Sequence, residues 1–282
     1  MSSKRARQRP GNARATADGL KLHRRTVRLD GREHTVIGLR PGTDARFSTN
    51  EFHRTWHVLS DGHGARLLAR LLWGLSYQSR PGTLLVIDRP FLTPTPFDGD
   101  PADPIVIVPS WHTPFTTHTA RALSRALPLR GASDGTVRWR THGLDTALED
   151  PRRWLSDTVP PWRPDRGRVE RRNGLIGLQP ADAQEMRVWA VQAGWLDPSG
   201  RHGTDYATLG PWRHGYTGEI QVFRDFRRDV AVARRARADV LSCTDETAAE
   251  DLRPLIWDRA GAIKRGRDVP PEGRQTELLA EP

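Results

Sequence analysis

Two short runs of uninterrupted apolar residues constrain the fold of this chain most strongly. The first is Thr83–Asp88, which reads Thr-Leu-Leu-Val-Ile-Asp, and the second is Ile105–Val108. Each run has the length of a strand, and its apolar residues do not alternate with polar ones. Continuous apolarity predicts strands that are buried on both faces, as in a parallel sheet covered by helices. The fold class that we expect is therefore α/β.

Periodic segments around these strands extend the predicted α/β domain over residues 20–158. Asp30-Gly31 lies between two alternating runs and predicts an N-terminal β-hairpin. Leucines at helical spacing predict a helix over 65–78, a second helix is expected over 116–127, and a third strand over Thr136–Arg140. The expected architecture is a helix-flanked, largely parallel sheet with an N-terminal hairpin.

Two other segments of this domain are interpreted from cap and turn signals. Ser48-Thr49-Asn50-Glu51 matches a capping box, and apolar residues follow it at helical spacing, so a helix is expected to begin there. Pro90–Pro104 contains five prolines. A loop of this length inside a compact domain is usually functional or disordered, and we expect an ordered one.

Composition divides the rest of the chain into an N-terminal arm, a linker, a C-terminal region and a tail. Residues 1–19 are basic with little to bury, so a disordered arm is expected there, and a disordered tail over 263–282. The Pro-rich segment 159–169 is expected to be a stiff linker. Beyond it, residues 170–262 are expected to form a mainly helical, Arg-rich region, whose longest amphipathic helix covers 219–240.

Basic residues dominate the charge, since the chain has a formal net charge of +10. All but three of its 44 basic residues are arginine. Arginine forks onto phosphate and carboxylate groups and stacks on aromatic rings. Such a balance attracts polyanions such as nucleic acid, but a composition bias of the genome would produce the same excess. Both interpretations stay open at this point.

Apolar content and cysteine content narrow the class of protein further. No window approaches the ~18 apolar residues that a membrane span requires, and no apolar stretch follows the basic N-terminus as in a secretory signal. We therefore expect a cytoplasmic protein with no membrane partner. Cys243 is the only cysteine, which excludes an intramolecular disulfide and a Cys-rich zinc site, and no disulfide-linked partner is expected.

The C-terminal half contains the clearest basic element. Five arginines fall on one stripe of the helix expected over 219–240: Arg224, Arg227, Arg228, Arg234 and Arg235. Such a stripe is the electrostatic footprint of nucleic-acid contact. The alternative is a solvated helix face, partly neutralised by acidic neighbours. Our first functional hypothesis is thus a polyanion-binding protein that engages nucleic acid through this Arg-rich helix.

The second hypothesis is an α/β enzyme, hydrolase-like or metal-dependent, that takes a small-molecule ligand. Asp88, His112 and His142 each follow a predicted strand. Because ligands bind outside the carboxyl ends of strands in open α/β sheets, these three could line one pocket as acid–base groups or ligands. Histidine and carboxylate suit several metals, and no particular metal or cofactor is indicated.

Overall fold

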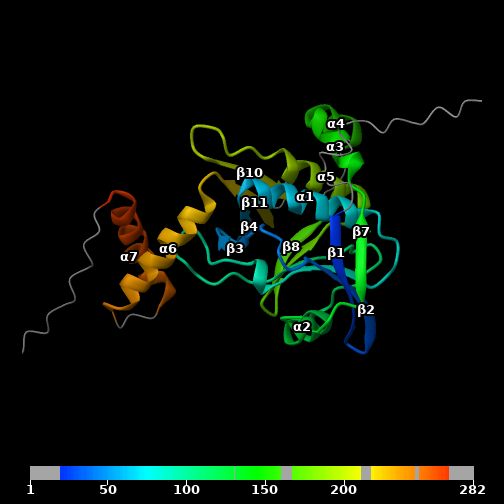
Figure 1. Ribbon diagram of the computed structural model, residues 1–282, viewed down its shortest axis with the longest axis horizontal. Coiled ribbons are helices and arrows are strands. Elements are labelled where there is room, and N and C mark those ends of the chain that lie inside the picture. The colour runs from blue at the N-terminus through cyan, green and yellow to red at the C-terminus, as the bar shows by residue number, and fades with distance from the viewer. Residues whose placement is uncertain (1–19, 130, 160–166, 211–216, 245–247, 267–282) are drawn as a thin grey trace, which may run out of the picture.

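The computed structural model of the protein describes residues 20–129, 131–159, 167–210, 217–244 and 248–266. The predicted arm, residues 160–166 of the predicted linker and residues 267–282 of the predicted tail lie outside the described residues. The described part is an α/β structure with two sheets and helices on their faces (Figure 1). No helix in that part is long and apolar enough to span a bilayer.

Seven strands form a mixed sheet, the large sheet, in the order β7-β1-β2-β5-β6-β9-β8. Its strands are β1 (Leu20–Leu29), β2 (Arg32–Gly38), β5 (Thr83–Ile87), β6 (Ile105–Ile107), β7 (Gly135–Trp139), β8 (Arg168–Arg172) and β9 (Leu175–Gln179). Asp30 and Gly31 both have positive φ angles, 49° and 74°, and join β1 to β2. Positive φ at both central residues is what a tight hairpin turn of the primed type requires.

Four strands form a second, small sheet in the order β10-β11-β4-β3. They are β3 (Phe47–Phe52), β4 (Thr55–Ser60), β10 (Thr204–Leu209) and β11 (Gly218–Phe223). The helix expected from the capping box at Ser48–Glu51 is therefore wrong, because these residues lie in β3 and Ser48 and Thr49 are buried. His53 and Arg54, at φ angles of 50° and 65°, turn the chain into β4. Pairing with β4 satisfies the backbone groups that a helix cap would have satisfied.

Seven α-helices and one short 3-10 helix are present among the described residues. They are α1 (Gly62–Ser76), η2 (Arg89–Phe91), α2 (Thr117–Ala126), α3 (His142–Glu149), α4 (Pro151–Thr158), α5 (Ala183–Trp195), α6 (Phe226–Leu241) and α7 (Ala249–Lys264). Helices α1 and α5 share one core cluster with residues of both sheets. Helix α2 packs on the opposite face of the large sheet, and α6 packs on the small sheet through Phe226 and Val230.

The expectation of a largely parallel large sheet is wrong. Only β2–β5 and β6–β9 pair in parallel, whereas the four other pairings in this sheet, including β5–β6, are antiparallel. The physical reason is the connection between β5 and β6. It contains the Pro-rich loop but no crossover helix, and a parallel neighbour needs a crossover of a dozen or more residues, usually helical. Burial of both faces, which the apolar runs did indicate, does not determine strand direction.

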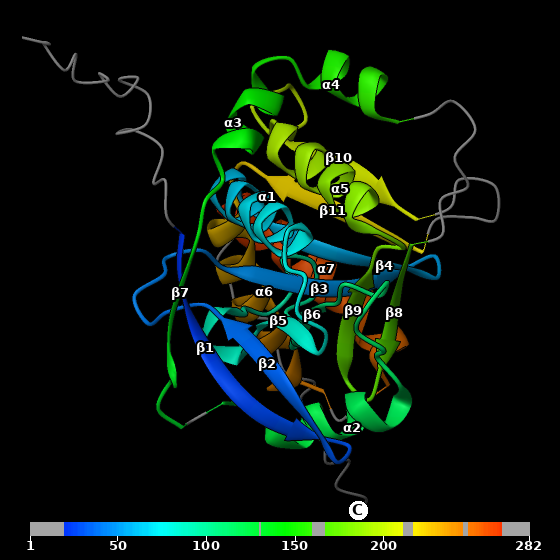
Figure 2. The same ribbon diagram turned by 90° about the vertical axis from the view of Figure 1, so that its right-hand side faces the viewer.

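The C-terminal region is mixed rather than mainly helical, because it contributes β8, β9, β10 and β11. Strands β8 and β9 extend the large sheet, and β11 pairs in parallel with β4 of the small sheet. Strands from both sides of the predicted linker thus share each sheet. Helices α6 and α7 lie together at one end of the molecule, and β7, β1 and β2 lie at the other (Figures 1 and 2).

Candidate functional site

The three residues of the predicted acid–base cluster line three separate pockets. Asp88 lines a pocket beside β2 and β5, His112 lines one near Pro81 and Gly82, and His142 lines one near Trp73. Strands β5 and β6 are antiparallel, so their carboxyl ends lie at opposite edges of the sheet. The structure therefore does not bring Asp88 and His112 together, and the geometry on which the enzyme hypothesis depended is absent.

Asp88 and His112 both have structural partners. The carboxylate of Asp88 accepts hydrogen bonds from the backbone N–H groups of Arg89, at 2.7 Å, and Leu129, at 3.0 Å. His112 is held at both ring nitrogens, with Nε2 2.8 Å from the Gln78 carbonyl and Nδ1 3.0 Å from the Thr113 hydroxyl. A carbonyl only accepts, so Nε2 carries the proton and the ring is held in one tautomer.

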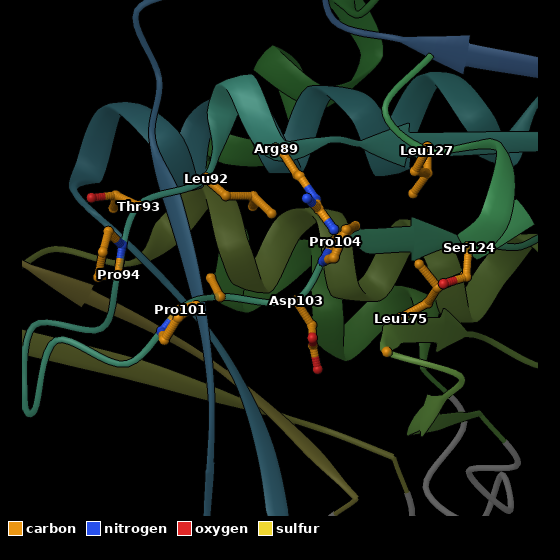
Figure 3. A pocket seen from close by; sticks show the side chains of 12 residues that line it. Arg89, Leu92, Thr93, Pro94, Pro101, Asp103, Pro104, Ser124, Leu127 and Leu175 are labelled. Atoms are coloured by element: carbon orange, nitrogen blue, oxygen red, sulfur yellow. The ribbon is translucent and has the colours of Figure 1, made fainter. Parts of the chain in front are cut away.

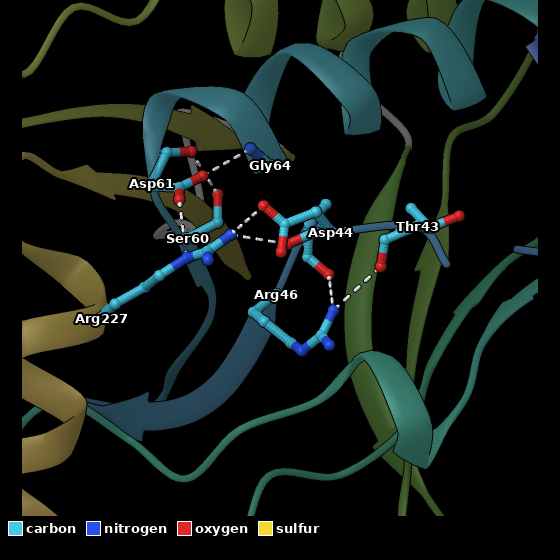
Figure 4. Close-up of polar contacts among 8 residues, drawn as sticks. Thr43, Asp44, Arg46, Ser60, Asp61, Gly64 and Arg227 are labelled. Atoms are coloured by element: carbon cyan, nitrogen blue, oxygen red, sulfur yellow. Dashed lines mark hydrogen bonds and ion pairs between the residues drawn. The ribbon is translucent and has the colours of Figure 1, made fainter. Parts of the chain in front are cut away.

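Two of the five arginines in the predicted stripe make contacts that hold loops in place. Arg224 lies in the turn before α6, where its guanidinium donates to the carbonyls of Pro198, Ser199 and Gly200. Arg227, the next stripe residue, lies in α6 and pairs with Asp44 at 2.8 Å and with Asp61, the N-cap of α1, at 3.7 Å (Figure 4). These two arginines fasten loops to the fold.

Three stripe residues, Arg228, Arg234 and Arg235, lie exposed on α6. The helix that was expected over 219–240 begins only at Phe226, because Gly218–Phe223 is strand β11. Alternation of Ile220 and Val222 with polar residues is the sequence signal that distinguishes this strand from a helix. The stripe is therefore shorter than the sequence indicated, and its cationic part belongs to one helix at one end of the molecule.

A second basic surface lies at the opposite end, on β1 and β7, and the sequence reasoning missed it. We call it the basic ribbon: Lys21, Arg25 and Arg138 project from one face of the two strands, Arg24 and Arg28 project from the other face, and Arg140 directly follows β7. Strand β7 is an edge strand, and neither β1 nor β7 contains an acidic residue. Arg24 and Arg25 lie close enough to Asp134 to lower the pKa of its carboxyl, although the hydrogen bond from Thr26 is the larger cause.

Within the ribbon, Lys21 and Arg138 are direct register partners on adjacent antiparallel strands. Residues that face each other in this way point to the same side of the sheet, and like charges placed there are destabilising. Within the described part of the chain, neither residue has an ion pair, and the same holds for Arg140. In the described part of the chain, the fold thus places Lys21 and Arg138 side by side with no carboxylate paired to either.

An aromatic recess adjoins the ribbon. It is a pocket of about 380 Å³ that Arg138 and Arg140 line together with Trp73, Tyr77 and Trp139. Trp73 and Trp139 are almost fully buried, whereas Tyr77 is 60% exposed. The Tyr77 ring also lies 5.2 Å from the guanidinium carbon of Arg187, in cation–π geometry. His142, which the sequence placed in the acid–base cluster, lies in this recess.

A larger pocket, the strand-end pocket, lies where the parallel strands β2 and β5 end. Its volume is about 580 Å³, and Asp88, His23, Arg25, Gly38 and Arg46 are among the residues that line it. The loop after β2 forms one wall. The Arg46 guanidinium holds this loop by donating to the Thr43 and Ala45 carbonyls, at 3.0 and 2.9 Å, and Arg227 holds it through Asp44 (Figure 4).

A fourth pocket, of about 490 Å³, lies along the Pro-rich loop and is lined by Pro94, Pro101 and Pro104 (Figure 3). Its charged groups are Arg89 and Asp103. The Asp103 carboxylate already accepts a 2.6 Å hydrogen bond from Nε of Arg171. This pocket therefore offers one uncompensated cation rather than a converging set of groups.

Two further findings concern metal ligands and similarity to known proteins. Among the residues that the structure describes, no three His, Cys, Asp or Glu side chains gather closely enough to hold a metal ion. Comparison of the chain with protein-family models, with curated proteins and with solved structures finds no match. Function must therefore be argued from the geometry of the chain itself.

Proposed function

We propose that this protein binds single-stranded nucleic acid through the basic ribbon of β1 and β7. The observation that carries the proposal is the direct opposition of Lys21 and Arg138, neither of which has an ion-pair partner among the described residues. Such an arrangement costs folding stability. A polyanion that lies along the ribbon would neutralise both charges and release counterions, which is the main source of affinity in nucleic-acid binding.

The aromatic recess supports a single strand rather than a duplex. Proteins that bind single strands combine a basic track for the backbone with aromatic rings on which unpaired bases stack. Here Arg138 and Arg140 belong to the ribbon and also line the recess that contains the exposed Tyr77 ring. The phosphates of a strand on the ribbon would therefore lie beside the exposed Tyr77 ring, on which one of its bases would compete with the Arg187 guanidinium.

The experiment compares two variants that remove the same number of charges at opposite ends of the molecule. Binding of a fluorescent single-stranded oligonucleotide is measured over a range of salt concentrations. Each phosphate contact contributes about 0.7 to the slope of log K against log salt for single strands. Lys21→Gln with Arg138→Gln should therefore flatten the slope by about 1.4, whereas Arg228→Gln with Arg234→Gln should leave it within about 0.3 of the wild-type value.

Stability gives an independent readout for the same ribbon variant. Because the change removes a like-charge pair on adjacent strands, the free energy of unfolding should rise by about 0.2–1 kcal/mol while affinity falls. If only Arg228→Gln with Arg234→Gln abolishes binding, the nucleic-acid site lies on the arginine stripe of α6 and not on the basic ribbon. Absence of binding by the wild-type protein at low salt would reject nucleic-acid binding altogether.

A further inference from the structure

Gly38, the last residue of β2, forms part of the floor of the strand-end pocket and is not required there by its own backbone. Its φ angle is not positive, and its register with His23 and Val86 is unbroken. A glycine in a strand costs stability and marks a bulge, a tight bend or a close approach by another group. The unbroken register excludes a bulge at Gly38.

Few atoms lie where a side chain at position 38 would begin. Gly38 is buried, yet a Cβ atom built on it would have only two heavy atoms within 4 Å. These are the Val86 carbonyl oxygen, at 3.7 Å, and Nη1 of Arg25, at 3.8 Å, and both are ordinary contact distances. Within the described part of the chain, no atom therefore forbids a Cβ at this position. The space above Gly38 belongs to the pocket.

We infer that the strand-end pocket binds a phosphomonoester of mononucleotide size, with Gly38 as its floor and Arg25 as its principal phosphate ligand. The volume of about 580 Å³ lies within the range of about 300–1,000 Å³ typical of small-molecule sites. Val86, Phe91 and Leu129 supply an apolar wall for a base or sugar. The site also lies where ligands bind in α/β sheets, outside the carboxyl ends of two parallel strands.

The charges around the pocket select an anion. Nε and Nη2 of Arg25 donate to the Gly131 carbonyl at 3.2 Å, which fixes the guanidinium and leaves Nη1 directed to the floor. Arg46 and Asp44 also line the pocket, and the Asp44 carboxylate is compensated by Arg227. The field is positive at His23 as well, since burial lowers the pKa of its imidazole first and the cations Arg25 and Arg40 lower it further.

Asp88 completes the site as an acceptor. Its carboxylate already accepts backbone hydrogen bonds from Arg89 and Leu129, which offset its negative charge. A carboxylate has about four lone-pair positions, so Asp88 retains capacity to accept a hydroxyl group of the ligand. Asp88 therefore has a place in a ligand site, although not in the acid–base cluster predicted from the sequence.

The test uses isothermal titration calorimetry and thermal melting with adenosine 5′-monophosphate, adenosine and inorganic phosphate as the probes. The monophosphate should bind at one site and raise Tm, and adenosine should bind at least about tenfold more weakly because it lacks the charged group that Arg25 recognises. A protein that binds none of the three up to millimolar concentrations, or that binds adenosine as well as its monophosphate, would overturn the inference.

Two variants locate the binding. Gly38→Ile fills the floor with a residue that favours strands, so the ligand-free protein should melt at or above the wild-type temperature while monophosphate binding is abolished. Arg25→Gln should weaken binding at least about tenfold without closing the pocket. Arg228→Gln, which removes a charge on α6, is the matched control and should bind as the wild type does. Equal binding by Gly38→Ile and wild type would show that the ligand lies elsewhere.

A phosphomonoester can reach the pocket as a free mononucleotide or as the 5′ end of a strand. Oligonucleotides with and without a 5′-phosphate distinguish the two sources. A preference for the phosphorylated end that Gly38→Ile removes would identify strand ends as the ligand. Equal binding of both oligonucleotides, with retained mononucleotide binding, would identify the free ligand. Neither result depends on Lys21 or Arg138: Arg25 belongs to both the ribbon and the pocket, but the ribbon variant Lys21→Gln with Arg138→Gln leaves Gly38 and Arg25 intact.

Discussion

Replacing Asp98 by alanine should destabilise the protein strongly, because this buried carboxylate joins the Pro-rich loop to α6 and α7. Asp98 accepts hydrogen bonds from the Thr95 hydroxyl and from the Asp100 backbone N–H, the latter at 3.1 Å. It also pairs with Nε of Arg253 in α7 at 3.2 Å, while Arg237 in α6 donates to its backbone carbonyl at 3.3 Å. The loop, the helix pair and the carboxylate therefore form one polar junction.

The magnitude follows from these contacts. The two hydrogen bonds to a charged, buried group contribute about 1.5 kcal/mol each. Arg253 has a side chain that is 44% exposed, so its ion pair is screened by water and adds about 0.5 kcal/mol. The sum is about 3.5 kcal/mol, which agrees with about 3–5 kcal/mol for breaking a buried pair. For a protein of this size, the expected fall in Tm is about 7–14 °C.

Urea unfolding monitored by circular dichroism measures the change, and Asp100→Asn serves as the matched control in the same junction. Burial, together with repulsion from Asp98, raises the pKa of the Asp100 carboxyl despite Arg237 and Arg253. The charged Asp100 carboxylate is thus poorly stabilised, and Asp100→Asn should lower the free energy of unfolding by less than about 1 kcal/mol. The reasoning fails if Asp98→Ala stays within about 1 kcal/mol of wild type, or if Asp100→Asn costs as much.

Three further outcomes are expected. Burial lowers the pKa of the His57 imidazole below 6.5, so the folded state takes up a proton there less readily than the unfolded state. The free energy of unfolding should therefore be highest above about pH 6.5 and fall as the pH drops below that value. His57→Leu should reduce this loss of stability at acidic pH, as measured by urea titrations. Gly218→Ala should cost about 1–3 kcal/mol, because its Cβ would lie 2.2 Å from Cγ2 of Val169, and a double-mutant cycle with Val169→Ala should show partial relief. Arg224→Met should speed hydrogen exchange at Ser199 and Gly200, whose carbonyls Arg224 binds, without changing the salt slope of oligonucleotide binding.

The locally encoded elements of the fold could be predicted from the sequence because their signals lie within a few residues. Thr83–Ile87 and Ile105–Ile107 form strands buried on both faces, as their unbroken apolar runs indicated. The leucine-rich segment forms α1, and Thr116 caps α2 through its side chain. Each of these outcomes depends on periodicity, capping or turn chemistry, which act between neighbours in the chain.

The candidate sites could be predicted only in part. Asp88 was singled out at a strand end, and it does line a pocket, but the partners that the sequence assigned to it lie in other pockets. The arginine stripe contained two exposed residues, Arg224 and Arg227, whose guanidinium groups are taken up by contacts that hold loops. The basic ribbon escaped prediction because Lys21 and Arg138 are separated by more than a hundred residues, and no local signal reports their register.

By itself, the sequence of this protein determined which segments are strands or helices where local patterns are strong, and how much charge the surface must carry. Tertiary structure alone decided that β6 runs against β5, that β4 pairs with β11, and that Lys21 opposes Arg138. These pairings join segments that lie far apart in the chain. Their free energy comes from hydrogen bonds and buried area that exist only once both partners are in place, so register and direction are properties of the assembled sheet.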